Sequence, residues 1–251
     1  MLLAGKNAVI YGAGGSIGGA VARGFADEGA TVHLAGRTME SLEKVATEIR
    51  AAGGVAETAQ VDALDEAAVN EHADAVAASA GSIDISFNLI AHGYVHGTPL
   101  AEMSLADFER PVLTAVRSTF LTARAAARHM RGQGSGVIMV FGGDGDPMSN
   151  YYIGGTQVAF AALEQLRRQL ACELGPHGIR AVSLRTGGIP ESIPEFDDLD
   201  SVVRETIVEP TMLKRAATLD DVGKVAAFAA SDHARTLTGT AVNISCGAIV
   251  D

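Results

Sequence analysis

A glycine-rich stretch near the start of the chain has the composition of a phosphate-binding turn. It reads Tyr11-Gly12-Ala13-Gly14-Gly15-Ser16-Ile17-Gly18 and lies between a short apolar run and a segment of helical periodicity. Glycines let the backbone turn sharply and approach a pyrophosphate, and the unpaired N–H groups that open a helix face the anion. We therefore expect a dinucleotide at this turn. The alternative is a tight connection that binds no ligand.

The residue after the second apolar run decides which dinucleotide fits. A carboxylate there accepts a hydrogen bond from a free ribose 2′-hydroxyl, whereas an arginine pairs with a 2′-phosphate. The chain has Ala35-Gly36-Arg37-Thr38, without an acid. NADP(H) is thus favoured over NAD(H), and the alternative for Arg37 is a solvated surface charge. Asp62, after the third run, could accept from the adenine amino group or only cap the following turn.

Candidate acid–base residues follow the fourth and fifth apolar runs. They are His92, His96, Asp144, Asp146, Tyr151, Tyr152 and Thr156. A His, an Asp and a Tyr that converge could move protons on a substrate, although each alone could be an ordinary loop, turn or packing residue. We select Tyr152 and His92 first, and Thr156 after them. The histidine and aspartate pairs lack a third ligand, so we predict no metal site.

The elements that must position these residues follow from hydrophobic periodicity. Short apolar runs alternate with longer helical segments, which predicts a single-domain Rossmann-type doubly wound parallel sheet of about seven strands flanked by helices. Because parallel strands end at one edge, the candidate residues should meet there. The predicted strands are 8–11, 31–35, 55–61, 83–90, 137–141, 179–184 and 241–244. The predicted helices are 39–52, 64–80, 105–130 and 157–174, with one more after the glycine turn and one opening at the capping box 218–221.

Two further segments have a recognisable character. Residues 187–212 contain three prolines and the acidic run 195–198 without periodicity, and we interpret them as a lid over the substrate. The lid composition does not identify that substrate, which we expect to be a small molecule. The helix 157–174 carries an apolar stripe with Arg167 and Arg168 opposite, which favours packing over ligand binding. With no linker in the sequence, we predict that residues 1–251 form one domain.

Charge and composition exclude some partners. The net charge is −11 and no basic cluster offsets it, so nucleic acid is excluded as a partner. The beginning of the chain has no basic leader and no long apolar stretch, which predicts a cytoplasmic protein without a membrane partner. Cys172 and Cys246 lack metal-ligand spacing, and we interpret each as a buried small apolar residue.

Four segments together resemble the short-chain dehydrogenase/reductase family along nearly the whole chain. Residues 3–12 resemble its opening strand and turn, 84–91 the strand that usually ends in Asn-Asn-Ala-Gly, 173–180 the end of its long interface helix, and 238–244 its last strand. The resemblance implies a nicotinamide cofactor and a homodimer or homotetramer built on helices 105–130 and 157–174. The cofactor-binding residues that it implies are Gly12, Gly15, Ser16, Ile17, Gly18, Arg37, Asp62, Ala63, Asn88, Ile90, Gly187 and Ile189.

The catalytic residues of that family are missing from the matching positions. Counting back from Glu173 without gaps places its tyrosine at Thr156, its lysine at Phe160, its serine at Gly143 and its helix asparagine at Ala115. The chain has no lysine between Lys44 and Lys214, so no shift of the alignment restores the Tyr–Lys pair.

Three functions are compatible with this pattern. The first is an NADP(H)-dependent carbonyl reductase with a nonstandard proton donor, and the second is a nucleotide-binding sensor or partner protein without catalysis. The third is a non-redox enzyme, such as a dehydratase, isomerase or cyclase. If redox chemistry survives, we predict slow reduction rather than oxidation, because reduction needs only a hydrogen-bond donor to the developing alkoxide whereas oxidation needs a base.

Overall fold

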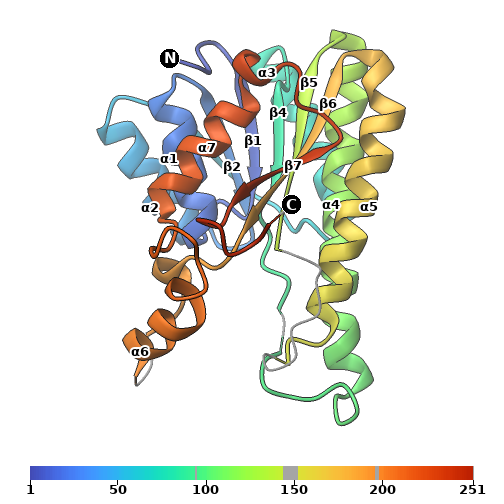
Figure 1. Ribbon diagram of the computed structural model, residues 1–251. Coiled ribbons are helices and arrows are strands. Elements are labelled where there is room, and N and C mark those ends of the chain that lie inside the picture. The colour runs from blue at the N-terminus through green and yellow to red at the C-terminus, as the bar shows by residue number, and fades with distance from the viewer. Residues whose placement is uncertain (94, 144–151, 196–197, 251) are drawn as a thin grey trace.

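The computed structural model describes residues 1–93, 95–143, 152–195 and 198–250. Seven parallel strands form one sheet in the order β3-β2-β1-β4-β5-β6-β7, which confirms the predicted fold class (Figure 1). The strands are β1 (Asn7–Tyr11), β2 (Thr31–Gly36), β3 (Val55–Gln60), β4 (Ile85–Asn88), β5 (Gly136–Gly142), β6 (Ile179–Thr186) and β7 (Thr240–Ile244). The longer helices are α1 (Ser16–Asp27), α2 (Met39–Ala51), α3 (Glu66–Ala80), α4 (Leu105–Gln133), α5 (Gly155–Leu174) and α7 (Leu219–Ala230).

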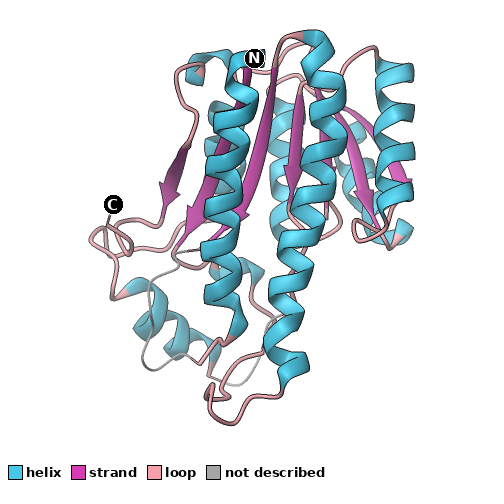
Figure 2. Cartoon of the chain, turned by 90° about the vertical axis from the view of Figure 1, so that its right-hand side faces the viewer, coloured by secondary structure: helices cyan, strands magenta, loops and turns pink. Residues whose placement is uncertain are grey.

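Helices cover both faces of the sheet, and Figure 2 shows the long α4 and α5 side by side on one of them. Apolar side chains of α1, α2 and α7, among them Phe25, Leu42 and Val222, form the core on one face. Those of α3 and α4, such as Val69 and Leu121, form the core on the other. The central strands β1, β4 and β5 are covered on both faces and are largely apolar, which made them recognisable as short continuous runs.

All strands end at the same edge of the sheet, which is the lower edge in Figure 1. The register places Tyr11 opposite Asn88, Gly142 opposite Arg185 and Thr186 opposite Ile244, so the last residues of neighbouring strands lie in line. The strand order reverses beside β1, and ligands of such sheets bind in the crevice outside the strand ends at that point.

The predicted lid contains helices that periodicity did not reveal. Three short helices follow β6, namely η2 (Pro190–Ser192), α6 (Leu199–Val203) and the π-helix η3 (Arg204–Val208). Figure 1 shows α6 beyond the carboxyl edge of the sheet. Helices of five residues or fewer are too short to display a repeating apolar stripe, which is why the sequence predicted a loop.

Two local predictions had opposite outcomes. The capping box is present, because Thr218 Oγ1 accepts from the Asp221 N–H at 3.1 Å and Asp221 Oδ2 accepts from the Thr218 N–H at 3.0 Å. The prediction of two buried cysteines was wrong for Cys172, which is exposed on α5, while Cys246 is half-buried. Within the described residues, we find no helix with the length and apolar character needed to cross a bilayer.

Candidate active site

The turn between β1 and α1 brings backbone segments into contact at two glycines. Gly12 has φ 83°, and a Cβ atom there would lie 2.5 Å from the carbonyl oxygen of Leu89 at the end of β4. A Cβ atom at Gly18 would overlap the Gly12 carbonyl oxygen. Side chains at either position would therefore force the turn and the strand end apart.

The first turn of α1 is open to an anion. Its N-cap is Gly15, which has no side chain to occupy the free N–H groups, and the first turn carries no acidic residue. Gly15 and Ser16 are exposed, and Ile17 is half-buried. A helix N-terminus with free N–H groups and a positive dipole end is a site for phosphate, so these residues fit a dinucleotide.

Arg37 and Asp62 lie at the ends of β2 and β3 beside this turn. The Arg37 carbonyl oxygen accepts from Gln60 Nε2 at 3.0 Å, which fixes its backbone. Its guanidinium is exposed and has no acceptor in the described parts of the chain. Asp62 Oδ1 accepts from the Leu64 N–H at 3.0 Å, so this carboxylate does cap its turn, and Ala63 beside it is buried.

The other implied cofactor residues lie along the ends of β4 and β6. Asn88 is buried, its Oδ1 accepts from the Ile90 N–H at 3.0 Å, and its Nδ2 donates to Thr122 Oγ1 on α4 at 3.2 Å. These bonds fix the end of β4. After β6, Gly187 lies against Ser245, and the Ile189 side chain is packed in the core, so only the Ile189 backbone can face a ligand.

Phe160 of α5 packs against Gly143, directly after β5, at two of the positions that match the family's catalytic residues. A Cβ atom at Gly143 would lie 2.6 Å from Cε2 of Phe160 and 3.0 Å from its Cδ2. Ala115 is buried against Ala159 and Leu163 in a small apolar cluster. The surroundings of positions 115, 143 and 160 are thus apolar.

His92 is the proton-transfer candidate that the structure places against Phe160. The two ring centroids are 6.3 Å apart and the ring planes are inclined by 62°. Burial lowers the pKa of His92 to about 4, so its imidazole is neutral at neutral pH. His96, which follows on the same loop, has a pKa lowered by partial burial.

The structure describes two further candidates, Tyr152 and Thr156. Tyr152 is 46% exposed, has φ 45°, and its carbonyl oxygen accepts from the Gly97 N–H at 3.1 Å. The Thr156 hydroxyl is buried without a hydrogen-bond partner among the described residues. Asp144, Asp146 and Tyr151 lie outside the described residues. Among the described residues, no group of three His, Cys, Asp or Glu side chains is able to hold a metal.

A buried ion cluster on α5 was not predicted from the sequence. Arg167 was expected on the outer face of the helix, but its side chain is 2% exposed. Its Nη2 donates to Glu164 Oε2 at 2.8 Å, and Nη2 of Arg185 on β6 donates to the same oxygen at 2.7 Å. Burial alone would raise the pKa of Glu164, but the hydrogen bonds from Arg167 and Arg185 lower it below its ordinary value. The spacing of Arg167 four residues after buried Leu163 was the available signal.

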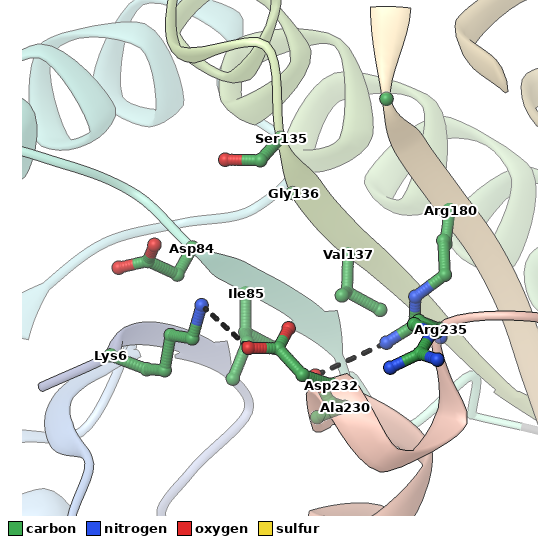
Figure 3. A pocket seen from close by; sticks show the side chains of 11 residues that line it. Lys6, Asp84, Ile85, Ser135, Gly136, Val137, Arg180, Ala230, Asp232 and Arg235 are labelled. Atoms are coloured by element: carbon green, nitrogen blue, oxygen red, sulfur yellow. Dashed lines mark hydrogen bonds and ion pairs between the residues drawn. The ribbon is translucent and has the colours of Figure 1, made fainter. Parts of the chain in front are cut away.

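A cavity of about 160 Å³ lies at the opposite, amino edge of the sheet (Figure 3). Lys6 Nζ and Asp232 Oδ2 form an ion pair across it at 3.7 Å. The Arg180 guanidinium donates to backbone carbonyls at the end of α7, including that of Ala230. These bonds join β1 and β6 to the end of α7, so we assign the cavity a structural role apart from the carboxyl-edge crevice.

Comparison with known proteins gives consistent matches along the whole chain. A family model described as Enoyl-(Acyl carrier protein) reductase matches residues 12–248. Cis-4-hydroxycyclohexanecarboxylate dehydrogenase of Sinomonas cyclohexanicum is 31% identical over 246 residues, which cover 96% of this chain and 95% of that relative. A solved short-chain type dehydrogenase/reductase from Mycobacterium marinum is 29% identical with a TM-score of 0.88, over 99% of this chain and 97% of that one. A gluconate 5-dehydrogenase from Burkholderia cenocepacia, solved with NADP and tartrate, is 25% identical with a TM-score of 0.87, over 98% and 96%.

Proposed function

The chain belongs to the short-chain dehydrogenase/reductase family, and from this premise we propose that it is an NADP(H)-dependent reductase of a small carbonyl compound. The observation that carries the proposal is the turn that opens α1: no side chain caps the first N–H groups of this helix, and side chains at Gly12 and Gly18 would clash with the backbone. A solved relative that holds NADP supports a nicotinamide cofactor. When bound, NADPH supplies the hydride.

The preference for NADP(H) rests on Arg37. Its exposed guanidinium follows β2, where it can pair with a ribose 2′-phosphate, and no carboxylate precedes it that would select a free 2′-hydroxyl. Asp62 after β3 would hold the adenine end of the bound cofactor, and the backbone at Asn88, Ile90 and Ile189 would hold its nicotinamide end.

We assign the proton-donor role to His92. Its neutral imidazole N–H donates a hydrogen bond to the carbonyl oxygen of the substrate, and water supplies the proton. The neighbouring Phe160 ring and Gly143 offer no polar group, so the oxygen has fewer donors than the serine and tyrosine of the family would give it. The removal of one such donor slows catalysis by about a hundredfold or more, which predicts a slow reductase. Alcohol oxidation is disfavoured further because His92, whose pKa is lowered to about 4 by burial, is a weak base.

The assembly that we propose is a homodimer or homotetramer in which the outer faces of α4 and α5 meet. Leu113 and Phe120 on α4 and Val158 on α5 are exposed apolar side chains on these helices. Leu113 and Phe120 are seven residues apart and therefore share one face of α4, where a second copy would bury them together. Light scattering on the native protein and on Leu113→Glu tests this assembly.

A second candidate function is a nucleotide-binding sensor without catalysis. The contact between Phe160 and Gly143 favours it, because an aromatic ring fills the position at which the family carries an ammonium group. In that case a bound nucleotide changes shape or partner binding and is not consumed.

Turnover decides between the two candidates. Nicotinamide absorbance is followed with NADPH over a panel of ketones and aldehydes, for the native protein, for His92→Phe and for Tyr152→Phe, which removes the hydroxyl of the other candidate donor. A reductase that uses His92 shows slow turnover that falls at least tenfold in His92→Phe and is retained in Tyr152→Phe. Tight NADPH binding without turnover on any substrate supports the sensor and contradicts the reductase.

A further inference from the structure

We propose that Gln60 is a positioning residue that sets the choice between NADP(H) and NAD(H). Its side-chain amide holds the backbone of Arg37, which places the Arg37 guanidinium for the ribose 2′-phosphate. The inference rests on the proposed function, because it assigns part of the cofactor selection to a residue on another strand.

The bond between the two residues joins the ends of two strands. Gln60 is the last residue of β3 and lies opposite Gly36, the last residue of β2. Its Nε2 donates to the Arg37 carbonyl oxygen at 3.0 Å, although the two residues are 23 positions apart in the sequence. Gln60 therefore reaches past its own partner in the ladder and holds the first residue after β2.

The carbonyl groups on both sides of Arg37 are held as well. That of Gly36 accepts from the Val61 N–H at 2.9 Å. That of Thr38, the N-cap of α2, accepts from Ser41 Oγ at 2.9 Å. Because its own carbonyl is held too, the Arg37 backbone has little freedom to turn.

Ser41 also shows how near this connection lies to the glycine-rich turn. A Cβ atom at Gly14 would overlap Ser41 Oγ, so the turn and the start of α2 are in contact. The groups expected to hold the pyrophosphate and the 2′-phosphate are therefore neighbours in space. One dinucleotide can span them only if the Arg37 backbone stays in place beside the turn.

An anchored backbone matters at this position because the Arg37 side chain is long and exposed. An arginine loses rotamer freedom when it binds a ligand, and a backbone that is already fixed lowers the total ordering cost. NADP(H) alone gains from this, since the guanidinium pairs with the 2′-phosphate that NAD(H) lacks. Loss of the Gln60 bond should therefore weaken NADP(H) binding selectively.

A contribution to fold stability explains the bond less well. Gln60 is exposed, and water competes for an exposed hydrogen bond, so the bond adds little to the free energy of unfolding. What the bond fixes is the backbone of a residue whose side chain is also exposed. This arrangement favours a role in binding.

Calorimetric titration with NADPH and with NADH tests the inference. Gln60→Met keeps the length of the side chain and removes its N–H donors. NADPH affinity should fall roughly threefold to tenfold, as for the loss of one hydrogen bond, while NADH affinity and the urea midpoint stay unchanged. The matched control is Thr58→Val, which removes the hydrogen bond from Thr58 to Glu43 between β3 and α2. It should leave the ratio of the two affinities unchanged.

A double variant shows whether Gln60 acts through Arg37. In an Arg37→Met background, Gln60→Met should have no further effect on NADPH affinity, because no guanidinium is left to position. The inference is overturned if Gln60→Met binds NADPH as the native protein does, or if it loses NADPH and NADH affinity equally. It is also overturned by a loss of NADPH affinity that persists in the Arg37→Met background, and by equal affinity of the native protein for both nucleotides. Failure of the native protein to bind either nucleotide would instead contradict the proposed function, so the two failures are distinguishable.

Discussion

The ring of Phe160 on α5 occupies the space that any side chain at position 143 would need. A Cβ atom at Gly143 would approach Cε2 of the ring to 2.6 Å, whereas one at the preceding Gly142 would meet the ring at an ordinary 3.6 Å. Glycine at position 143 and phenylalanine at position 160 both depart from the family pattern, and the two departures are therefore linked sterically. A serine at position 143 requires that the residue at position 160 be smaller or point elsewhere.

This link predicts a non-additive effect on stability. Gly143→Ala should lower the free energy of unfolding by about 1–3 kcal/mol, because the methyl group overlaps the Phe160 ring. In a Phe160→Ala background the same change should cost much less. Urea denaturation of both single variants and the double variant measures the coupling, with Gly142→Ala as the control that leaves the ring undisturbed. Additive effects of the two changes would contradict the contact.

The close approach at Gly12 predicts a local defect in nucleotide binding. Gly12→Ala pushes a methyl group against the Leu89 carbonyl and strains a backbone at φ 83°, so NADPH affinity should fall at least tenfold. The matched control is Gly53→Ala, because Gly53 has φ 88° with no atom within 4 Å of an added Cβ. Calorimetric titration of both variants separates backbone strain from the loss of the binding turn. Equal NADPH affinity in the two variants would show that the turn does not hold the nucleotide.

Reversal of the charge at Arg37 should reverse the cofactor preference. Arg37→Asp removes the partner of the 2′-phosphate and supplies an acceptor for a 2′-hydroxyl, so NADPH should lose roughly tenfold or more in affinity while NADH gains. Fluorescence titration with both nucleotides tests it, and Arg235→Asp, an exposed arginine at the opposite, amino edge of the sheet, should change neither affinity. If Arg37→Asp leaves the NADPH affinity unchanged, the Arg37 guanidinium is a solvated surface charge and does not bind the 2′-phosphate.

Two half-buried histidines, His72 and His92, make the fold sensitive to mild acid. Burial lowers the pKa of both His72 and His92 from 6.5 to about 4. The unfolded chain therefore takes up protons below about pH 6.5 that the folded chain refuses until about pH 4. The contribution of these histidines to the free energy of unfolding is constant above pH 6.5. Between pH 6.5 and pH 4 it falls steadily, by up to about 3 kcal/mol for each histidine before solvent screening is considered.

Urea midpoints measured from pH 7.5 down to pH 4 check this dependence. Replacement of His92 by Phe removes a buried titrating group, so the decline in stability with falling pH should become shallower. An identical pH profile in His92→Phe would mean that this histidine is hydrated in the native state.

The parts of the structure that depend on neighbours in sequence were predicted well. Seven apolar runs gave the strands, and the Thr218–Asp221 capping box gave the start of α7, because both arise from local chemistry. Arg167 was misplaced because a charged residue normally faces water, and its partner Glu164 is not recognisable as a buried acid without the packing of α5 on β6. The Gly143–Phe160 contact could not be predicted either. Each residue departs from the family pattern in the sequence, but their steric contact arises only from tertiary packing.

Isothermal titration of the purified native chain with NADPH, and separately with NADH, tests the central claim that the amides opening α1 receive a pyrophosphate. The account predicts saturable binding of both dinucleotides, with NADPH bound at least tenfold more tightly because Arg37 meets its extra phosphate. Heat changes no larger than dilution for both dinucleotides would contradict it.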